Sequence, residues 1–398
     1  MLALEILFWG SAALIVWTQL GYATALLALA RVLPAPAAGP REPDLRSRDS
    51  GGASQQSSPA AQLPDMSLIV AAHDEQAVIA AKVANALSLD YPRERLQVIV
   101  ACDGCTDATA ERAREAGADL VLELSRGGKI RAQDAAVEQA RGELVAFSDA
   151  NALWEPDAAR ELVGAFADPR VGYACGQVRF LGGAGTNQEG VYWRYEMAVR
   201  ERESRLSSIT AGNGAIYATR RDSYIVVDPI MGHDLSLPFN TVKRGLRAVY
   251  VSSARASEKM VPSIGGEFAR KRRMMSHTWP ILLRGGILSP RGYPPGYALM
   301  ILSHRLLRYA TPALHAIAFA ANVALVALSG GGAQVLYAVT LGLQLLLLLA
   351  AALAGMLPLR PLLVARYYVL TTASIAAGLW DWLRHGTEAS WEAAEGTR

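Results

Sequence analysis

Long apolar runs at the two ends of the chain constrain its fold more than any other feature. One run covers about residues 2–30, and three more follow at about residues 309–328, 335–357 and 362–383. Each is long enough to cross a bilayer as a helix, which takes about 20 residues. Arg366 and several hydroxyl side chains interrupt the last run, so a tilted or buried helix is an alternative to a full span there.

The first apolar run predicts a membrane anchor. A cleaved signal peptide is the alternative, because residues 34–38 (Pro-Ala-Pro-Ala-Ala) resemble a processing site. However, no basic residue precedes the run, and its apolar core is too long for a signal peptide. Arg31 follows this run, Arg305 and Arg308 precede the second, and Arg360 lies between the third and fourth. Basic residues on the cytoplasmic side predict a multi-pass protein of a bacterial-type inner (plasma) membrane, with both termini outside and the intervening domain cytoplasmic.

Composition sets further limits. The chain has 398 residues and a net charge of +3, which is too small to indicate a nucleic-acid partner. Its three cysteines provide no disulfide framework. The sequence divides into an N-terminal transmembrane helix (1–31), a flexible linker rich in Pro, Ala, Gly and Ser (32–64), a cytoplasmic α/β domain (65–260), interfacial amphipathic helices (261–300), C-terminal transmembrane helices (301–385) and a tail (386–398).

Strands and helices alternate through the first half of the cytoplasmic domain. Buried strands are expected at 67–72, 96–102, 119–124 and 144–149, with helices at 78–89, 108–117 and 127–140. This spacing predicts a parallel sheet with helices on both faces. In such sheets, ligands bind at the carboxyl ends of the strands.

Polar side chains follow those strand ends. Asp103 and Asp149 each close a strand, and Gly127-Gly128-Lys129 opens a helix, a combination that suits a nucleoside diphosphate. Asp149 with Asn151 can hold a divalent cation, although a strand ending in an Asx-turn explains Asp149 alone. Cys102-Asp103-Gly104-Cys105 also fits a redox pattern, which we consider the weaker interpretation.

The second half of the domain offers a base and cations. Gly212 and Asn213 belong to a Gly-rich turn, and Asp234 lies near the start of a later helix, where it can act as a general base. Arg270 and Arg273 belong to a basic helix before the second apolar run. They can stabilise a leaving diphosphate, or contact anionic lipid, or do both.

These motifs resemble the membrane-bound family 2 glycosyltransferases with a GT-A fold, the cellulose-synthase-like and poly-N-acetylglucosamine-synthase-like group. The first-strand motif of the family resembles the stretch from Ala71 through His73 to Glu75, where the Glu and the general shape match. Its Asp-Gly-Ser-x-Asp motif resembles residues 103–107, with Cys105 in the Ser position. The resemblance makes Asp103 a nucleotide contact and Lys129 part of the donor site.

Three later motifs extend the resemblance. The metal-binding Asp-x-Asp resembles Asp149-Ala-Asn151, and the catalytic Glu-Asp motif resembles Gly232-His233-Asp234, with His233 in the Glu position either facing the acceptor or orienting the loop. The Gln-x-x-Arg-Trp of processive members resembles residues 270–274, where Arg270 replaces Gln and Met replaces Trp. That Trp stacks on the acceptor sugar in the family, so its loss weakens the case for a polymerase.

The resemblance implies an inverting hexosyltransferase that uses a nucleotide diphosphate sugar, Mg²⁺ or Mn²⁺, and a lipid or saccharide acceptor beside membrane lipid. The expected catalytic residues are Asp234 and Arg273. The expected donor residues are Ala71, His73, Glu75, Asp103, Lys129, Asp149 and Arg270; the acceptor side has Gly212, Asn213 and His233. A processive polysaccharide synthase-translocator, acting in polysaccharide biosynthesis, and a non-catalytic nucleotide-sensing membrane protein remain alternatives.

Overall fold

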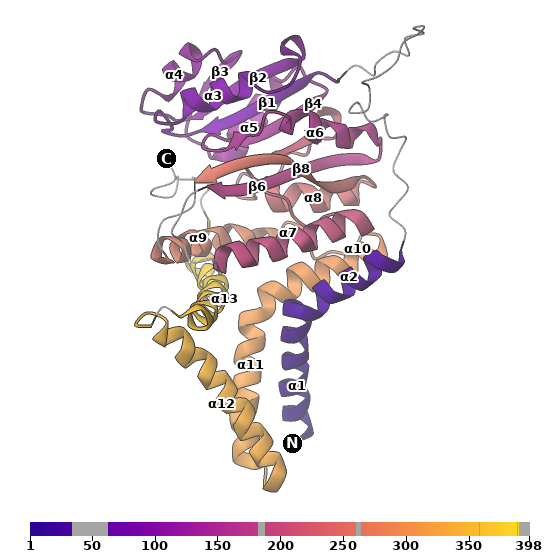
Figure 1. The fold of residues 1–398 in the computed structure, drawn as a ribbon, viewed down its shortest axis with the longest axis vertical. Helices are drawn as coiled ribbons and strands as arrows, with labels where there is room; N and C mark the ends of the chain where they lie inside the picture. The colour runs from indigo at the N-terminus through magenta and orange to yellow at the C-terminus, as the bar shows by residue number, and fades with distance from the viewer. Residues whose placement is uncertain (34–62, 182–187, 260–263, 358, 388, 390–398) are drawn as a thin grey trace, which may run out of the picture.

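The computed structural model describes residues 1–33, 63–181, 188–259, 264–357, 359–387 and 389. Figure 1 shows an α/β domain at one end of the molecule and long helices that extend away from this domain toward the other end. Helix α7 (Gln188–Leu206) lies between the sheet and the N-terminal helices, while α9 (Ile264–Leu283) lies between the sheet and α13 (Arg360–His385). The predicted linker, 32–64, lies almost wholly outside the described residues.

The α/β domain is built on one eight-stranded sheet with the order β3-β2-β1-β4-β7-β6-β8-β5. Its strands are β1 (Met66–Ala72), β2 (Leu96–Asp103), β3 (Leu120–Leu124), β4 (Leu144–Asp149), β5 (Leu153–Trp154), β6 (Val171–Leu181), β7 (Tyr217–Arg220) and β8 (Arg247–Lys259). The four strands β1 to β4 are parallel, as predicted. Beyond β4 the sheet is mixed, because β7 pairs antiparallel with both β4 and β6.

Helices cover the sheet because its central strands are apolar along their whole length. Every residue of β1 and β2 is buried, as expected for strands covered on both faces. The covering helices are α3 (Ile79–Leu87), α4 (Thr109–Glu115), α5 (Lys129–Glu138), α6 (Ala158–Gly164) and α8 (His233–Lys243), with single-turn 3₁₀ helices at 93–95, 165–167 and 221–223. The parallel register places Ala71 beside Asp149, and Ala72 beside Cys102, so the strand ends meet at one edge.

Four helices of the described chain are long and apolar enough to cross a membrane. The first joins α1 (Leu2–Val16), a π-helical turn (Trp17–Gly21) and α2 (Tyr22–Val32). The second joins α10 (Pro295–Met300), a π-helical turn η5 (Ile301–Leu306) and α11 (Leu307–Leu328). The others are α12 (Gly331–Leu353) and α13.

The second of these helices begins earlier than the sequence suggested. The apolar pattern predicted a span from about residue 309, but the helix runs without a break from Pro295. Ser303, His304 and Arg305 interrupt the apolar pattern, yet all three are buried. They face other parts of the protein, so their polarity marks a packing surface and not the end of a helix.

Candidate functional site

Lys129 is the centre of the site. It is the first residue of α5 and follows Gly128, whose φ of 96° lies in a region that favours glycine. Its ammonium contacts the carboxylate of Asp149, at the end of β4. Burial alone would lower the pKa of Lys129, but Asp149 and then the charges of Asp234 and Glu258 hold that pKa above its ordinary value. One carboxylate therefore contacts this cation, and two more, from separate elements, act on it through their charge.

Glu258 is a site residue whose role the sequence did not assign. It lies near the end of β8, and its backbone pairs with Phe180 of β6. Burial and then the negative charge of Asp149 raise the pKa of Glu258 to about 7. The charges of the two carboxylates repel each other, and a divalent cation bound by both would relieve that repulsion. Oxygen donors from Asp149, Asn151 and Glu258 are ligands that Mg²⁺ and Mn²⁺ favour.

Lys82 supports the turn that carries Asp149 and Asn151. This residue of α3 has no exposed surface, and its Nζ donates a hydrogen bond to the Ala152 carbonyl at 2.7 Å. The ammonium also lies 5.3 Å from the ring centre of Trp154. Burial lowers the pKa of Lys82 to about 7, although Asp149 and Glu258 oppose that effect. Lys82 thus places a cation directly behind the predicted metal-binding turn.

Asp234 lies in the first turn of α8 and is partly exposed. Among the residues the structure describes, no donor is hydrogen-bonded to its carboxylate, which leaves its oxygens able to accept a proton. Its backbone is fixed instead, because the Gly212 amide donates to the Asp234 carbonyl at 2.6 Å. A side chain on Gly212 would collide with the Tyr173 hydroxyl. The Gly-rich turn and the predicted base are therefore in direct contact.

The neighbours of Asp234 and Gly212 are structural supports. Asn213 is buried, donates to the Gly176 carbonyl at 2.7 Å and accepts from the amides of Ala215 and Ile216. His233 is buried against Phe147, with its ring nitrogens 2.9 and 3.3 Å from two tyrosine hydroxyls. Burial, with a contribution from Lys129, lowers the pKa of His233 to about 3. These contacts favour the loop-orienting role for His233, one of two that the sequence left open.

The predicted nucleotide side lies at the ends of β1 and β2. The Asp103 carboxylate is 1% exposed and accepts hydrogen bonds from the amides of Gly127 (2.6 Å) and Gly128 (3.0 Å). It therefore shapes the loop that leads to Lys129, and its role as a nucleotide contact stays a prediction. His73 Nδ1 lies 2.8 Å from the Asp103 carbonyl, whereas Ala71 and Glu75 are buried.

A small group at the same edge has potential metal ligands. Ligand atoms of His73, Asp74 and Cys105 lie within 4.8 Å of one another. Asp74 already accepts a hydrogen bond from the Thr106 amide at 2.7 Å, and the Cys105 thiol donates to the Ala72 carbonyl at 3.5 Å. Cys105 is a free thiol, as is Cys102. We interpret the group as the packing of the turn.

Helix α9 brings cations to the other side of the site. The charge of Arg270 acts on Glu258 and opposes the rise in its pKa, while Arg270 Nη1 lies 3.5 Å from the Met274 sulfur. Arg273 is exposed one turn further along the helix. His277 of the same helix lies 3.4 Å from the carbonyl of Ile230, in the loop before Asp234. The basic helix thus lies beside both the donor carboxylates and the predicted base.

Comparison with known proteins adds an independent finding. A family model described as glycosyltransferase like family 2 matches residues 64–276, more than half of the chain. A beta-monoglucosyldiacylglycerol synthase of Nostoc sp. is 36% identical over 117 residues, which are 28% of this chain and 25% of that protein. The probable glycosyltransferase YdaM of Bacillus subtilis is 28% identical over 134 residues, 31% of this chain and 32% of that protein. The matches thus span about a quarter to a third of these curated relatives.

A solved structure resembles the whole chain. The mannosyltransferase PcManGT from Pyrobaculum calidifontis, in complex with GDP-Man and Mn²⁺, superposes with a TM-score of 0.69. The alignment covers 96% of this chain and 97% of that one, at 24% sequence identity. At this identity the likeness establishes the fold alone.

Proposed function

Because the chain belongs to the family 2 glycosyltransferases and has the GT-A fold, we propose that it transfers a sugar, with inversion, from a nucleotide diphosphate donor to a lipid acceptor at the cytoplasmic membrane face. One observation carries the proposal. Lys129 lies among Asp149, Asp234 and Glu258, so a phosphate-binding cation, an oxygen-donor set for a metal and a general base share one site. A nucleotide sensor would need the first two features but would have no task for Asp234.

The donor side would be held by charge. Lys129 offers an ammonium to the diphosphate, and Arg270 and Arg273 add positive charge from α9. Asp149, Asn151 and Glu258 would hold Mg²⁺ or Mn²⁺, which when bound neutralises the leaving diphosphate. Mn²⁺ and GDP-Man are present together in the PcManGT structure. Glu258 would thereby compensate for Asn151, which stands where the family has a second Asp.

The chemical step would be a single displacement. Asp234 Oδ takes the proton from the acceptor hydroxyl, whose oxygen attacks the anomeric carbon from the face opposite the diphosphate. The bond between that carbon and the phosphate oxygen breaks, and its electron pair leaves with the nucleoside diphosphate. Arg273, Arg270 and Lys129 stabilise the negative charge on the leaving group. The configuration at the anomeric carbon is inverted because one displacement occurs.

A lipid acceptor is favoured over a saccharide by the membrane helices. A cavity of about 350 Å³ lies between α11, α12 and α13, with largely apolar walls. His315 and Tyr368, joined by a hydrogen bond of 2.7 Å, provide polar groups at its wall. The curated relatives from Nostoc and Synechocystis are also named for a lipid product. Single transfer is favoured over processive synthesis because Met274 replaces the stacking Trp.

The test is release of nucleoside diphosphate by purified protein in lipid nanodiscs, across a panel of nucleotide sugars, with and without Mn²⁺ and with diacylglycerol or a prenyl phosphate as acceptor. We expect metal-dependent release with one donor and radiolabelled sugar in the lipid extract. Asp149→Ala should abolish both. Donor binding without turnover for every acceptor would instead support the nucleotide-sensing alternative.

A further inference from the structure

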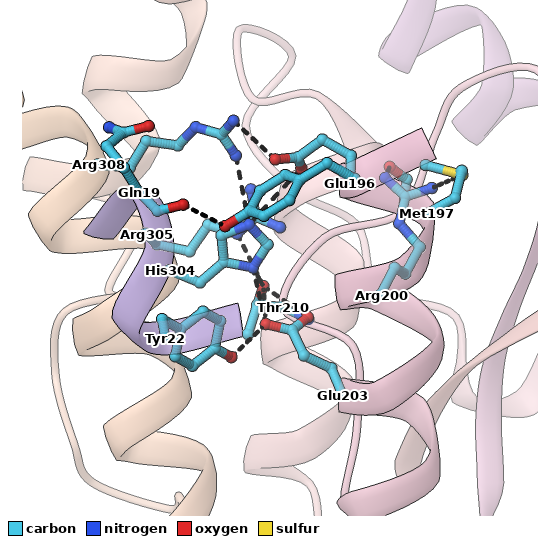
Figure 2. Close-up of polar contacts among 12 residues, drawn as sticks. Gln19, Tyr22, Glu196, Met197, Arg200, Glu203, Thr210, His304, Arg305 and Arg308 are labelled. Carbon is cyan, nitrogen blue, oxygen red and sulfur yellow. Dashed lines mark hydrogen bonds and ion pairs between the residues drawn. The ribbon is translucent and has the colours of Figure 1, made fainter. Parts of the chain in front are cut away.

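A buried polar cluster joins the α/β domain to the membrane helices (Figure 2). It contains residues of α2, α7, η5, the start of α11 and the segment after α7; we call it the interface cluster, and its members are Tyr22, Glu196, Glu203, Thr210, His304, Arg305 and Arg308. None of these residues belongs to the site described above.

Glu203 is the hub of the interface cluster. Its carboxylate has no exposed surface and accepts hydrogen bonds from the Tyr22 hydroxyl (2.6 Å) and from the amide of Thr210 (3.1 Å). His304 Nδ1 lies 2.7 Å from the same carboxylate. Burial alone would raise the pKa of Glu203, but the charges of His304 and Arg305, with these hydrogen bonds, hold it at about 2. Glu203 is therefore a buried anion held by two membrane helices.

Thr210 carries the contact from the membrane helices to the segment that reaches the catalytic site. Its hydroxyl accepts a hydrogen bond from Arg305 Nε at 2.8 Å and lies 3.1 Å from Glu203 Oε2. Tyr297 adds a bond of 3.0 Å to the carbonyl of Ile209. Three contacts therefore fix residues 209 and 210 to η5, α10 and α7.

Two residues further on, the same segment holds the predicted base. Gly212 accepts a hydrogen bond from Arg200 of α7 at 3.0 Å and donates one to the carbonyl of Asp234 at 2.6 Å. Both polar groups of the Gly212 backbone are therefore bonded, and this residue packs directly against the Tyr173 hydroxyl. A displacement of Thr210 must therefore change the position of the Asp234 backbone.

On this basis we propose that the interface cluster is a positioning device: Thr210 and Glu203 transmit the arrangement of the membrane helices to Asp234 and so set the rate of sugar transfer. Stability alone does not account for the cluster, because replacing a buried ion pair by apolar residues is often neutral or stabilising. The directed hydrogen bonds of the cluster instead fix the relative positions of the helices and the segment after α7. A displacement of about 1 Å at a reacting group can lower the rate by about a hundredfold. The proposal rests on the role given to Asp234 above.

The test compares Thr210→Val with Thr210→Ser. Valine keeps the shape of threonine but loses the hydroxyl that contacts Glu203 and Arg305, whereas serine keeps it. Tyr195→Phe is the matched control, because the Tyr195 hydroxyl also joins α7 to a membrane helix, at the Gln19 carbonyl (3.2 Å), but has no link to Gly212. We expect Thr210→Val to lower kcat by about tenfold or more with unchanged donor affinity, and both other variants to stay within about threefold of wild type.

Hydrogen–deuterium exchange provides a readout that does not depend on the proposed function. The Gly212 amide, bonded to Asp234, should exchange about tenfold faster in Thr210→Val and at the wild-type rate in Tyr195→Phe. Unchanged protection at Gly212, or an equal loss of kcat in Thr210→Val and Thr210→Ser, would overturn the positioning role. Absence of transfer by the wild-type protein, with the expected change in exchange, would instead overturn the proposed function and leave the contact to Asp234 established.

Discussion

Glu258→Gln tests whether the second carboxylate of the site binds a cation. In the free protein the pKa of Glu258 is raised from 4.5 to about 7, by burial and then by the charge of Asp149. That rise corresponds to about 3 kcal/mol, at about 1.4 kcal/mol per pH unit. Because the residue is partly exposed, solvent screening makes this an upper value. A cation bound by Asp149 and Glu258 would recover much of that free energy.

The proton and the cation should compete for Glu258. With a pKa of about 7, the ionised fraction of this carboxylate rises about tenfold between pH 6 and pH 8. The apparent Mn²⁺ affinity of the wild-type protein should rise by about the same factor across that interval. Glu258→Gln should bind Mn²⁺ more weakly at pH 8 and show a nearly flat profile. Electron paramagnetic resonance of free Mn²⁺, in a titration of protein in nanodiscs, measures both.

Two comparisons make this result decisive. Lys82 also has a pKa near 7, so the loss of the pH dependence in Glu258→Gln, and not the wild-type profile alone, assigns the titration. Asp134→Asn is the control, because burial also raises the pKa of Asp134 while its carboxylate accepts a bond from Tyr224. An unchanged slope in Glu258→Gln, or an equal loss in Asp134→Asn, would refute a role for Glu258 in cation binding.

The same pKa fixes the sign of a stability effect. The folded protein holds a proton on Glu258 between pH 4.5 and about 7, whereas the unfolded chain does not. The contribution of this group to stability is therefore complete below pH 4.5 and is lost as the pH rises through about 7. Without metal, Glu258→Gln should melt at a higher temperature than wild type at pH 8, and Mn²⁺ should reduce the difference.

Three further predictions concern catalysis and the acceptor. Asp234→Asn should lower kcat by about 10²–10⁴-fold with unchanged donor affinity by calorimetry, and full activity would reassign the base. Since the pKa of His233 is about 3, its ring is neutral above pH 5, and His233→Asn should leave the shape of the pH profile of kcat unchanged between pH 5 and 9; a shifted limb would contradict this. Ala373→Trp should fill the cavity and raise the KM for the lipid acceptor several-fold, whereas Val339→Trp on an exposed face of α12 should not; equal effects would argue against an acceptor site there.

The parallel half of the sheet could be predicted because its signals are local. Apolar runs of five to seven residues, each ended by a polar residue and followed by helical spacing, define a strand and the edge where it ends. The sequence therefore placed Asp103 and Asp149 at the ends of β2 and β4, where the structure has them. The strand order of the mixed half could not be predicted, because β7 has four residues and its place between β4 and β6 depends on pairing with distant strands.

Two charged residues of the site were missed for different reasons. Lys82 shares the buried face of α3 with Ile79 and Val83, and this helical spacing is a signal from which its burial could have been predicted. Its partner, the Ala152 carbonyl, lies 70 residues away and carries no sequence signal. Glu258 lies near the end of β8, a strand that runs on to Lys259. Its importance follows from the effect of the Asp149 charge on it, which the fold alone creates.

The interface cluster shows why charges beside an apolar run are hard to interpret from sequence. Arg305 and Arg308 were used as markers of the cytoplasmic side of the membrane, and that orientation stays a prediction. In the structure Arg308 is paired with Glu196 at 2.7 Å, and Arg305 is bonded to Thr210, about a hundred residues earlier in the chain. A cation that faces lipid head groups and a cation that faces a buried carboxylate look the same in the sequence, because the difference lies entirely in the partner. The partners here lie on α7 and on the segment that follows it, and this segment leads directly to Gly212, whose amide donates to the carbonyl of Asp234. The residues that suggested how the protein sits in a membrane are therefore the ones through which the membrane helices can act on catalysis.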